Sequence, residues 1–254
     1  MVEVAVIGGG LAGLAAALRL QRHGVDVQLY ESADRVGGVV QTCAQEDGFV
    51  FERGPHSIRA GSAHIAQLVA DLQLEDSTMP SLPAARRRFI WRNGRLQALP
   101  GAPHTLIGSS ILSFGAKLRL LREPFVGPAD ATLDETVADF FRRRLGPEVV
   151  AALVDPFVTG IFAGDPEQLG IDAFPTVRAA EREHGSLFQA LRARRSSSAG
   201  GGLYSFDDGL ERLPRALGEA LGERVHLGHS ISSVEPGDEH VVVRSIQGDI
   251  EAER

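Results

Sequence analysis

The residues with the clearest chemical meaning lie near the start of the chain, where Gly8-Gly9-Gly10-Leu11-Ala12-Gly13 matches the pattern G-x-G-x-x-G. In this pattern Gly8 permits a tight turn, Gly10 lets the backbone approach a pyrophosphate, and Gly13 lets a helix pack closely on a sheet. We expect Leu11 and Ala12 to open that helix, so that its free amides and positive dipole end face the phosphates. The pattern predicts a dinucleotide site.

A carboxylate stands where such a site needs one. Glu31, followed by Ser32, comes directly after the strand-like run Val25–Tyr30, where it can accept hydrogen bonds from an adenosine ribose. Its charge would repel a 2′-phosphate, which favours FAD or NAD over NADP. The alternative is a glycine-rich turn followed by an acid through chance.

A second glycine pair distinguishes between these two cofactors. Asp34-Arg35-Val36-Gly37-Gly38 follows Glu31 at once, and nicotinamide enzymes have no need of it. In flavoproteins that bind FAD in an extended pose, this loop runs back along the pyrophosphate. Gly37 and Gly38 leave room for it and Arg35 adds positive charge, so we expect FAD. An ordinary Gly-Gly turn is the alternative.

These residues must be positioned by a strand–helix–strand unit. Val2–Ile7 is a β-branched run, Leu11–His23 has apolar residues at helical spacing, and Val25–Tyr30 alternates as a second strand. Together they predict a βαβ half of a parallel sheet with a right-handed crossover.

The rest of the chain is expected to be helical in its middle and mixed at its end. The expected elements are a helix over Ser62–Leu74, a hairpin over Arg88–Leu96 turning at Asn93-Gly94, a helical region from about Thr105 to Arg195, a loop over Ser196–Gly202, a helix over Gly209–Leu221, and strands over Val225–Val234 and His240–Ser245. Within the helical region, Thr132–Glu135 fits a capping box. Gly146-Pro147 ends one helix there and starts the next.

Composition excludes several classes of protein. The 254 residues are 43% apolar, which excludes low-complexity disorder and suggests one large domain or two small ones. The single cysteine, Cys43, excludes a disulfide scaffold and fits a reducing cytosol. No apolar run is long enough to span a bilayer, and a strand starting at Val2 leaves no room for a leader. The net charge of −7 argues against nucleic acid as a partner.

The motifs, taken with Phe51-Glu52-Arg53-Gly54-Pro55-His56-Ser57, resemble the flavin-dependent amine oxidase superfamily. In that superfamily the loop of Gly54, Pro55 and His56 lies near the flavin ring. Later segments are similar to the protoporphyrinogen oxidases within it: Arg88–Trp91, Gly94–Pro100, Asp155–Asp165, Glu167–Leu169, Phe174-Pro175, Glu181–Leu187 and Ser205–Leu210.

This resemblance implies FAD-dependent oxidation of protoporphyrinogen IX to protoporphyrin IX in heme biosynthesis, in three two-electron steps with oxygen as acceptor. Because the flavin supplies the difficult chemistry, no residue is assigned a catalytic role. Arg88 matches an arginine that pairs with a substrate propionate, Gly160 a glycine whose backbone lies over the tetrapyrrole, and Phe162 a position in the same cavity. The alternatives are a solvated hairpin face for Arg88 and tight helix–loop packing for Gly160 and Phe162.

The resemblance also implies an organisation for the chain: an α/β fold with a Rossmann-like FAD-binding βαβ domain and a discontinuous, largely helical region for substrate and membrane, incomplete relative to the family. The expected segments are 1–57 for FAD binding, 58–100 for the substrate-domain hairpin, 101–198 for the helical region and 199–254 for the return toward the FAD domain. Family members continue for about as many residues again, so we expect the 254 residues alone to hold the flavin ring loosely and to oxidise substrate weakly or not at all.

Other functions stay open at this level. They are coproporphyrinogen III oxidation, an amine oxidase or carotenoid desaturase activity, and a non-catalytic nucleotide-binding fragment. The helix over residues 104–126 either docks peripherally on a membrane or packs in the core, in a protein expected in the cytoplasm. A homodimer is an open alternative.

Two further patterns contain residue types that bind ligands. His226 and His229 on one strand would face opposite sides, so we expect no metal site. The arginine clusters 142–144 and 192–195 are interpreted as solvated helix faces, with phosphate or acidic lipid binding as the alternative.

Overall fold

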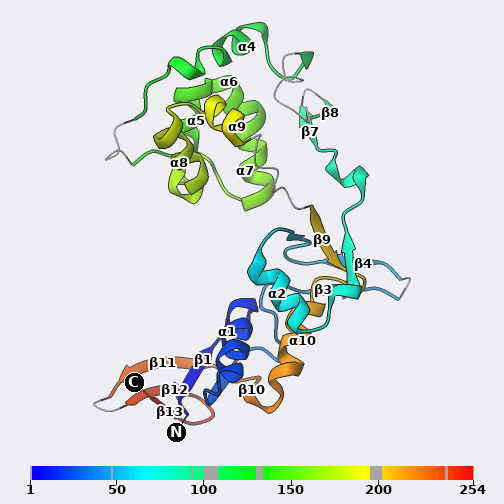
Figure 1. Cartoon of the computed structure of the whole chain (residues 1–254), viewed down its shortest axis with the longest axis vertical. Coiled ribbons are helices and arrows are strands. Elements are labelled where there is room, and N and C mark those ends of the chain that lie inside the picture. Colours follow the sequence, from blue (N-terminus) through cyan, green and yellow to red (C-terminus); the bar gives the residue numbers. More distant parts are fainter. Residues whose placement is uncertain are drawn as a thin grey trace. The chain divides into compact units, whose positions relative to one another are not determined.

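The strand–helix–strand unit predicted at the start of the chain is present in the computed structural model (Figure 1). β1 (Val4–Ile7) pairs in parallel with β2 (Val27–Tyr30), and α1 (Leu11–Arg22) connects the two strands. The β-branched runs form the strands, and the leucines spaced along α1 turn its apolar face to the sheet. The predicted fold class is therefore seen directly in this part of the chain.

The structure describes residues 2–46, 48–92, 94–99, 108–129, 134–194, 202–237 and 240–253. The chain divides into two units. Unit 1 comprises Met1–Ser81 and Gly200–Arg254, and unit 2 comprises Leu82–Ala199. Unit 1 is thus built from both ends of the chain.

The third strand of the parallel sheet in unit 1 comes from the far end of the sequence. β10 (Val225–His226) pairs in parallel with β2, giving the order β1-β2-β10. The predicted single strand over Val225–Val234 is wrong, because Gly228 takes a positive φ of 70° and turns the chain. The chain then enters a different sheet as β11 (Ile231–Pro236).

The core of unit 1 lies between this sheet and two helices. Leu14 and Leu18 of α1 are buried against Leu217 of α10 (Arg212–Leu221) and against the strand residue Leu29. All four side chains are less than 4% exposed, so the position of α1 on the sheet is fixed by close apolar packing.

Smaller antiparallel sheets complete unit 1. They are β11 with β12 (His240–Ser245) and β13 (Ile250–Glu253), β3 (Thr42–Ala44) with β4 (Val50–Glu52), and β9 (Leu203–Phe206) between β5 (Ile58–Arg59) and β6 (Thr78–Pro80). The amide of Val2 donates to the carbonyl of Glu251 at 2.9 Å, which joins the two chain ends (Figure 1).

Both predicted helices of unit 1 that follow α1 are present, with bounds that differ from the predicted ones. α2 (Ala63–Asp71) starts after Ser62, whose hydroxyl accepts from the Ile65 amide. It ends three residues before the predicted Leu74, because Gln73 takes a positive φ of 55°, and η1 (Glu75–Ser77) follows. α10 begins at Arg212 rather than at Gly209, because Gly209 has a φ of 101° that no helix accommodates. A short 3₁₀ turn, η6 (Gly222–Arg224), leads from α10 into β10.

Unit 2 is mostly helical, as predicted. Its elements are η2 (Pro83–Arg86), β7 (Phe89–Arg92), β8 (Arg95–Ala98), α4 (Phe114–Leu120), η3 (Glu123–Phe125), α5 (Val137–Leu145), α6 (Pro147–Val149), the π-helical η4 (Val150–Val154), α7 (Asp155–Phe162), η5 (Ile171–Ala173), α8 (Pro175–His184) and α9 (Leu187–Arg194). The predicted hairpin is confirmed as β7 paired with β8, and the predicted break at Gly146-Pro147 lies between α5 and α6. Asn93 lies outside the described residues. So does the predicted loop over Ser196–Gly202, except for Gly202 itself.

The helix start predicted in unit 2 is misplaced. The N-cap of α5 is Thr136, whose hydroxyl accepts from the Asp139 amide at 3.1 Å. Glu135 pairs instead with Arg143, and Thr132 lies outside the described residues. Phe140 and Val158 belong to the buried core of this unit. In the described part of the chain no helix has both the length and the apolar character needed to cross a membrane.

Candidate functional site

The turn from β1 into α1 has the geometry of an anion site. The Gly8 amide donates to the Tyr30 carbonyl at 2.8 Å, which ties the turn to the end of β2. A Cβ on Gly13 would lie 2.0 Å from the Gly8 carbonyl oxygen, so only glycine allows α1 to start this close to the strand. Gly10 is the N-cap, and the amides of the first turn, at Leu11 and Ala12, have no intrahelical acceptor. These amides and the helix dipole favour a bound phosphate.

Glu31 is held at the edge of this turn. Its Oε2 accepts from the Gly9 amide at 2.6 Å, and its Oε1 accepts from the Ala33 amide at 2.8 Å and the Ser32 hydroxyl at 3.1 Å. Burial opposes ionisation, but the bonds from Ala33, Gly9 and Ser32 outweigh it and lower the pKa of Glu31. The carboxylate is therefore ionised at neutral pH. With the Ser32 amide included, four donors reach this carboxylate, so a ribose hydroxyl would share one of its oxygens with a donor already bound.

The loop after Glu31 packs against the glycine turn. The Gly37 amide donates to the Gly9 carbonyl at 2.8 Å, and a Cβ on Gly38 would lie 3.3 Å from the Cα of Gly10. The positive charge that Arg35 is predicted to add beside a pyrophosphate stays a prediction, and the structure shows how this side chain is held. Its guanidinium donates to the carbonyls of the loop at Val36, Gly38 and Val40, at distances of 2.7 to 3.2 Å. Arg35 thus holds the shape of the loop, and its charge lies 3.8 Å from the carboxylate of Glu211.

Gly54 reaches the same loop from β4. A Cβ on Gly54 would lie 1.9 Å from the Val39 carbonyl oxygen, so the backbones pass in contact. Pro55 and His56 are exposed, and the His56 ring lies 3.3 Å from the Ser57 hydroxyl. The structure therefore brings Gly54 into contact with the loop, whereas the placement of Pro55 and His56 near a flavin ring stays a prediction.

Sequence reasoning missed a set of bonds that ties α10 to the β3–β4 hairpin. The Leu210 amide donates to Glu52 at 2.7 Å and the Glu211 amide donates to the Thr42 hydroxyl at 3.0 Å. The Thr42 amide in turn donates to Glu211 at 2.8 Å. The one sequence signal for this connection is the segment Ser205–Leu210, whose similarity to the protoporphyrinogen oxidases indicates its importance but not its partners.

His226 and His229 lie together rather than on opposite sides, so the predicted geometry is wrong. Their ring centroids are 5.6 Å apart, and both rings contact Tyr30. β10 ends at His226, so strand alternation does not extend to His229. Burial, followed by the charge of His229, lowers the pKa of His226. No group of three or more His, Cys, Asp or Glu side chains within the described ranges is arranged to hold a metal ion.

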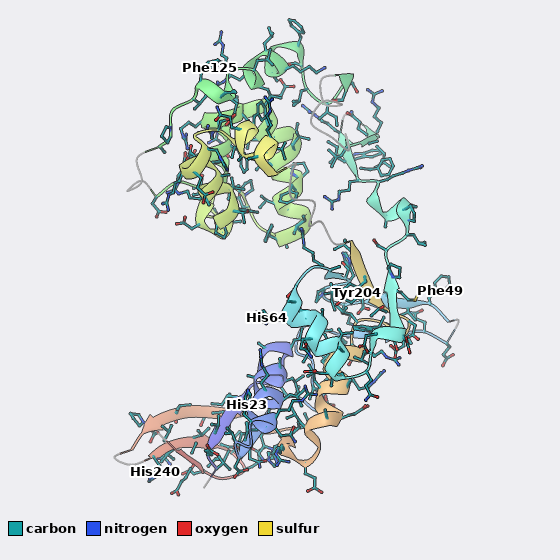
Figure 2. The ribbon with its side chains drawn as sticks, viewed as in Figure 1. His23, Phe49, His64, Phe125, Tyr204 and His240 are labelled. Atoms are coloured by element: carbon teal, nitrogen blue, oxygen red, sulfur yellow. The ribbon has the colours of Figure 1, made fainter. Side chains whose placement is uncertain are left out.

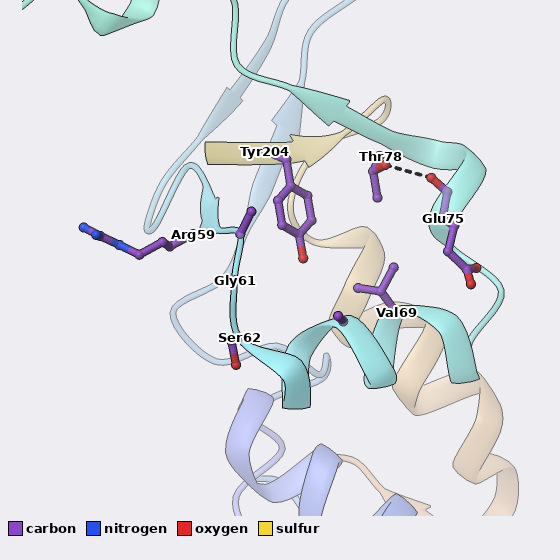
Figure 3. Close-up of a pocket in the computed structure, with 9 residues that line it drawn as sticks. Arg59, Gly61, Ser62, Val69, Glu75, Thr78 and Tyr204 are labelled. Carbon is purple, nitrogen blue, oxygen red and sulfur yellow. Dashed lines mark hydrogen bonds between the residues drawn. The ribbon is translucent and has the colours of Figure 1, made fainter. Parts of the chain in front are cut away.

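A separate cavity of about 220 Å³ in unit 1 lies between α2 and β9 (Figure 3). Tyr204 points its hydroxyl into this cavity from β9, opposite Val69 of α2. Burial raises the pKa of Tyr204. None of the predicted cofactor residues lines this cavity.

The predicted substrate residues belong to unit 2. Arg88 directly precedes β7 and is exposed, and its carbonyl accepts from the Leu99 amide at 2.8 Å. Gly160 is exposed on α7, and a Cβ built there meets no atom within 4 Å. Local packing therefore does not require glycine at this position. Phe162, the last residue of α7, is 48% exposed.

The arginine cluster in α5 is not simply a solvated face. Arg144 is fully buried; its Nε donates to Glu123 at 2.8 Å and its Nη1 to Glu181 at 2.5 Å. Arg143 bonds Glu135 and Glu181, whereas the side chain of Arg142 is 40% exposed. The prediction is wrong for Arg143 and Arg144, because their partners lie far away in the sequence. Of the second cluster, Arg192 is exposed and residue 195 lies outside the described residues.

The apolar segment over residues 104–126 divides between core and surface. Ile111 and Leu112 are buried at 3% exposure, while Phe114 and Leu121 are 76% and 64% exposed. Phe125, labelled in Figure 2, is 88% exposed on η3. Within this segment, residues 104–107 lie outside the described ranges.

The glycine turn, the helix start and the placed carboxylate define unit 1 as a dinucleotide-binding α/β domain. Residues 11–253 match the family model "Flavin containing amine oxidoreductase", and the chain belongs to this family. The resemblance derived from the motifs is thereby confirmed.

Several curated relatives within this family are similar to the chain. The chain is 32% identical over 256 residues to protoporphyrinogen oxidase 2 of Arabidopsis thaliana, and 37% identical over 247 residues to protoporphyrinogen oxidase of Homo sapiens. These matches cover 91% and 87% of the chain but 50% and 51% of the relatives. Coproporphyrinogen III oxidase of Bacillus subtilis is 33% identical over 214 residues, 78% of the chain and 45% of the relative. The chain spans about half the length of the curated relatives it matches.

Solved structures agree with the fold. A protein from Exiguobacterium sp. 255-15, provisionally named protoporphyrinogen oxidase, aligns with a TM-score of 0.76 and 26% identity over 99% of the chain and 58% of its own length. Cyclohexylamine oxidase of Brevibacterium oxydans aligns with a TM-score of 0.70 at 23% identity, over 99% of the chain and 56% of its own length, which shows the fold alone.

Proposed function

We propose that this chain carries the FAD-binding and porphyrinogen-binding parts of a protoporphyrinogen oxidase. The observation that supports FAD is the bond from the Gly9 amide to Glu31, which sets an ionised carboxylate beside a helix start whose first amides have no intrahelical acceptor. Such a pair suits the ribose and the pyrophosphate of an ADP group. The names of the relatives support the porphyrinogen as substrate.

The chain's own residues have distinct tasks in this proposal. The amides at the start of α1 hold the pyrophosphate, and Glu31, with Ser32 beside it, accepts from the ribose. Arg35 keeps the loop of Gly37 and Gly38 in the shape that leaves room for the cofactor. When bound, FAD supplies the two-electron oxidation chemistry, so these residues bind and orient rather than react.

The substrate side of the proposal rests on residues of unit 2. The exposed guanidinium of Arg88 suits a propionate, since its planar fork binds a carboxylate with two bonds. Gly160 leaves open space above its backbone, where a flat macrocycle can lie. Phe162 offers an exposed aromatic ring for the same ligand. Oxygen is the proposed electron acceptor.

The test is oxidation of protoporphyrinogen IX by the purified chain supplied with FAD, followed through porphyrin fluorescence, beside coproporphyrinogen III at equal concentration. Faster oxidation of protoporphyrinogen IX supports the proposal, even at a low rate. Faster oxidation of coproporphyrinogen III favours the second substrate, which carries propionates in place of the two vinyl groups. A chain that neither binds nor oxidises any porphyrinogen refutes the substrate assignment.

A peripheral membrane contact, for a protein proposed in the cytoplasm, is supported by the exposed apolar residues of α4 and η3. Phe114, Leu121 and Phe125 are each more than 60% exposed, and Lys117 and Arg122 lie beside them in the sequence. Exposed apolar side chains next to basic groups suit an anionic lipid surface. Flotation with anionic and with neutral liposomes tests this contact; recovery in neither lipid fraction refutes it.

A further inference from the structure

The cavity between α2 and β9 is bounded by backbone that is held in place on two sides. On one side β9 pairs with both of its neighbours through Tyr204, which lies opposite Ile58 of β5 and Pro80 of β6. On the other side Gly61 turns the chain with a φ of 104°, and a Cβ built there would meet no atom within 4 Å. Hydrogen-bonded strands and a glycine turn thus keep a volume of about 220 Å³ open.

The ring of Tyr204 is anchored at its base. It packs edge to face on Phe206, with centroids 6.2 Å apart, and Phe206 is 3% exposed in the core of unit 1. The two side chains share one face of the sheet because they are two positions apart on β9. The core therefore fixes the direction of the Tyr204 hydroxyl, which points into the cavity (Figure 3).

This hydroxyl differs from the other two that line the cavity. The Ser62 hydroxyl accepts from the Ile65 amide at 3.4 Å, and the Thr78 hydroxyl donates to the Glu75 carbonyl at 2.7 Å. Of the residues that the structure describes, none is hydrogen-bonded to the Tyr204 hydroxyl (Figure 3). Burial raises the pKa of Tyr204, so the group keeps its proton at neutral pH. It is therefore a donor that a ligand can use.

The surroundings of this donor are apolar and uncharged. Val69 is 4% exposed and lines the cavity together with Ala66, both from α2. Figure 3 shows the charged ends of Arg59 and Glu75 directed away from the Tyr204 hydroxyl. A charge placed among such side chains would lose its hydration without gaining a partner. The cavity therefore suits an uncharged ligand.

The size and the single donor restrict the ligand further. An apolar cavity of about 150 Å³ binds benzene. The 220 Å³ between α2 and β9 therefore has room for one six-membered ring with a short substituent. A carbonyl oxygen accepts a hydrogen bond and donates none, so it matches Tyr204 without leaving a donor of its own unsatisfied among apolar side chains.

We propose that this cavity binds a small, uncharged ring compound with a carbonyl group, whose oxygen accepts from the Tyr204 hydroxyl while its ring packs on Val69 and Ala66. The site is independent of the proposed function, because no residue assigned to FAD or to the porphyrinogen lines the cavity.

Titration of the purified full chain with acetophenone, followed by ligand-observed NMR, tests this site. Ethylbenzene serves as the second probe, since it has nearly the same size and shape but no acceptor. We expect Tyr204→Phe to weaken acetophenone binding about three- to tenfold, the effect of one neutral hydrogen bond, and to leave ethylbenzene binding no weaker. The variant keeps the ring that packs on Phe206. Benzoate, which is charged, should bind the parent chain more weakly than acetophenone.

A pair of alanine variants tests the location. Ala66→Leu should abolish detectable binding of both probes, because the larger side chain occupies the space that the ring needs. Ala70→Leu is the matched control: Ala70 is also exposed on α2, one helical turn later, and it does not line the cavity. This control should bind both probes as the parent chain does. Thermal melting of each variant verifies that it is folded.

The outcomes separate the site from the hydrogen bond. No binding of acetophenone by the parent chain, or binding that survives Ala66→Leu, overturns the site. Acetophenone binding that is unchanged in Tyr204→Phe, or weakened no more than that of ethylbenzene, overturns the role of Tyr204 and the carbonyl class. If Tyr204→Phe does not fold, benzoate binding as tight as that of acetophenone still overturns the choice of an uncharged ligand. The FAD and porphyrinogen assignments are tested by other ligands and stand or fall separately.

Discussion

Replacing Arg144 by methionine tests whether buried ion pairs hold the helices of unit 2 together. Arg144 in α5 is fully buried, and its guanidinium reaches Glu123 of η3, Glu181 of α8 and the carbonyl of Gly185. Methionine fills much of the same volume but leaves the carboxylate of Glu123, itself fully buried, without a cation. The change therefore isolates the charge from the packing.

The size of the effect follows from the remaining partners. Removing one member of a buried ion pair costs about 3–5 kcal/mol. Glu181 keeps its bond to Arg143 at 2.9 Å, and Glu123 keeps the Ser186 hydroxyl at 2.5 Å and the Leu187 amide at 2.8 Å. We therefore expect a loss near the lower limit, about 3 kcal/mol in the free energy of unfolding.

Urea unfolding at pH 7, followed by far-ultraviolet circular dichroism, measures this loss. With a slope of about 1.5 kcal/mol per molar urea, the midpoint of the unit 2 transition falls by about 2 M. Amide exchange of the peptide that contains Leu187 localises the effect. The matched control is Arg142→Met, because Arg142 is 40% exposed and its ion pairs to Asp139 and Glu167 are solvated. That control should cost less than about 1 kcal/mol.

Acid provides a second readout of the same pair. Burial opposes ionisation of Glu123, but bonds from Ser186, the Leu187 amide and Arg144 outweigh it and lower its pKa from the ordinary 4.5. A lowered folded-state pKa stabilises the fold above that ordinary value and loses its effect as the pH falls through the folded pKa. Stability should therefore decline below about pH 4.5, and less steeply in Glu123→Gln. Equal urea midpoints for Arg144→Met and Arg142→Met would refute the reasoning.

Three further predictions concern binding. Gly13→Ala should abolish FAD binding and destabilise unit 1 by about 1–3 kcal/mol, because its Cβ meets the Gly8 carbonyl oxygen. Gly115→Ala, whose Cβ meets only the Ser113 hydroxyl at an ordinary contact distance of 3.9 Å, should do neither; calorimetric titration and thermal melting check both variants. Arg88→Ala should raise KM for protoporphyrinogen IX about tenfold and leave kcat unchanged, as measured from steady-state rates of porphyrin fluorescence. An unchanged KM would contradict the contact between Arg88 and a propionate. Phe114→Ser with Phe125→Ser should reduce recovery with anionic liposomes about tenfold. Recovery equal to that of the parent chain argues against docking through α4 and η3.

Local patterns predicted the parts of the fold that depend on neighbouring residues. The β1–α1–β2 unit and the break at Gly146 could be read from the sequence because apolar spacing and glycine act within a few residues. The placement of Glu31 beside the glycine turn followed from the same pattern. The bond from Gly9 that fixes its carboxylate was not predicted, because it joins residues 22 positions apart.

Features that depend on distant partners could not be predicted. A run of three arginines is typical of a solvated face, and only the arrival of Glu123 and Glu181, 21 and 37 residues away, buries Arg144. The bonds from Arg35 to the carbonyls of Val36, Gly38 and Val40 could not be predicted either, because they depend on how the loop folds. The strand over Val225–Val234 was divided by one positive φ at Gly228.

Calorimetric titration of the purified chain with FAD, in the presence and absence of ADP, tests the central claim most directly. We predict one FAD site for which ADP competes and NADP does not. We also predict that Glu31→Ala weakens FAD binding about tenfold or more, the loss of bonds to a charged group. The control Glu219→Ala, at an exposed position of α10, should bind as the parent chain does. FAD binding that ADP does not displace, or that Glu31→Ala leaves unchanged, would contradict the assignment of the glycine turn and Glu31 as the nucleotide site.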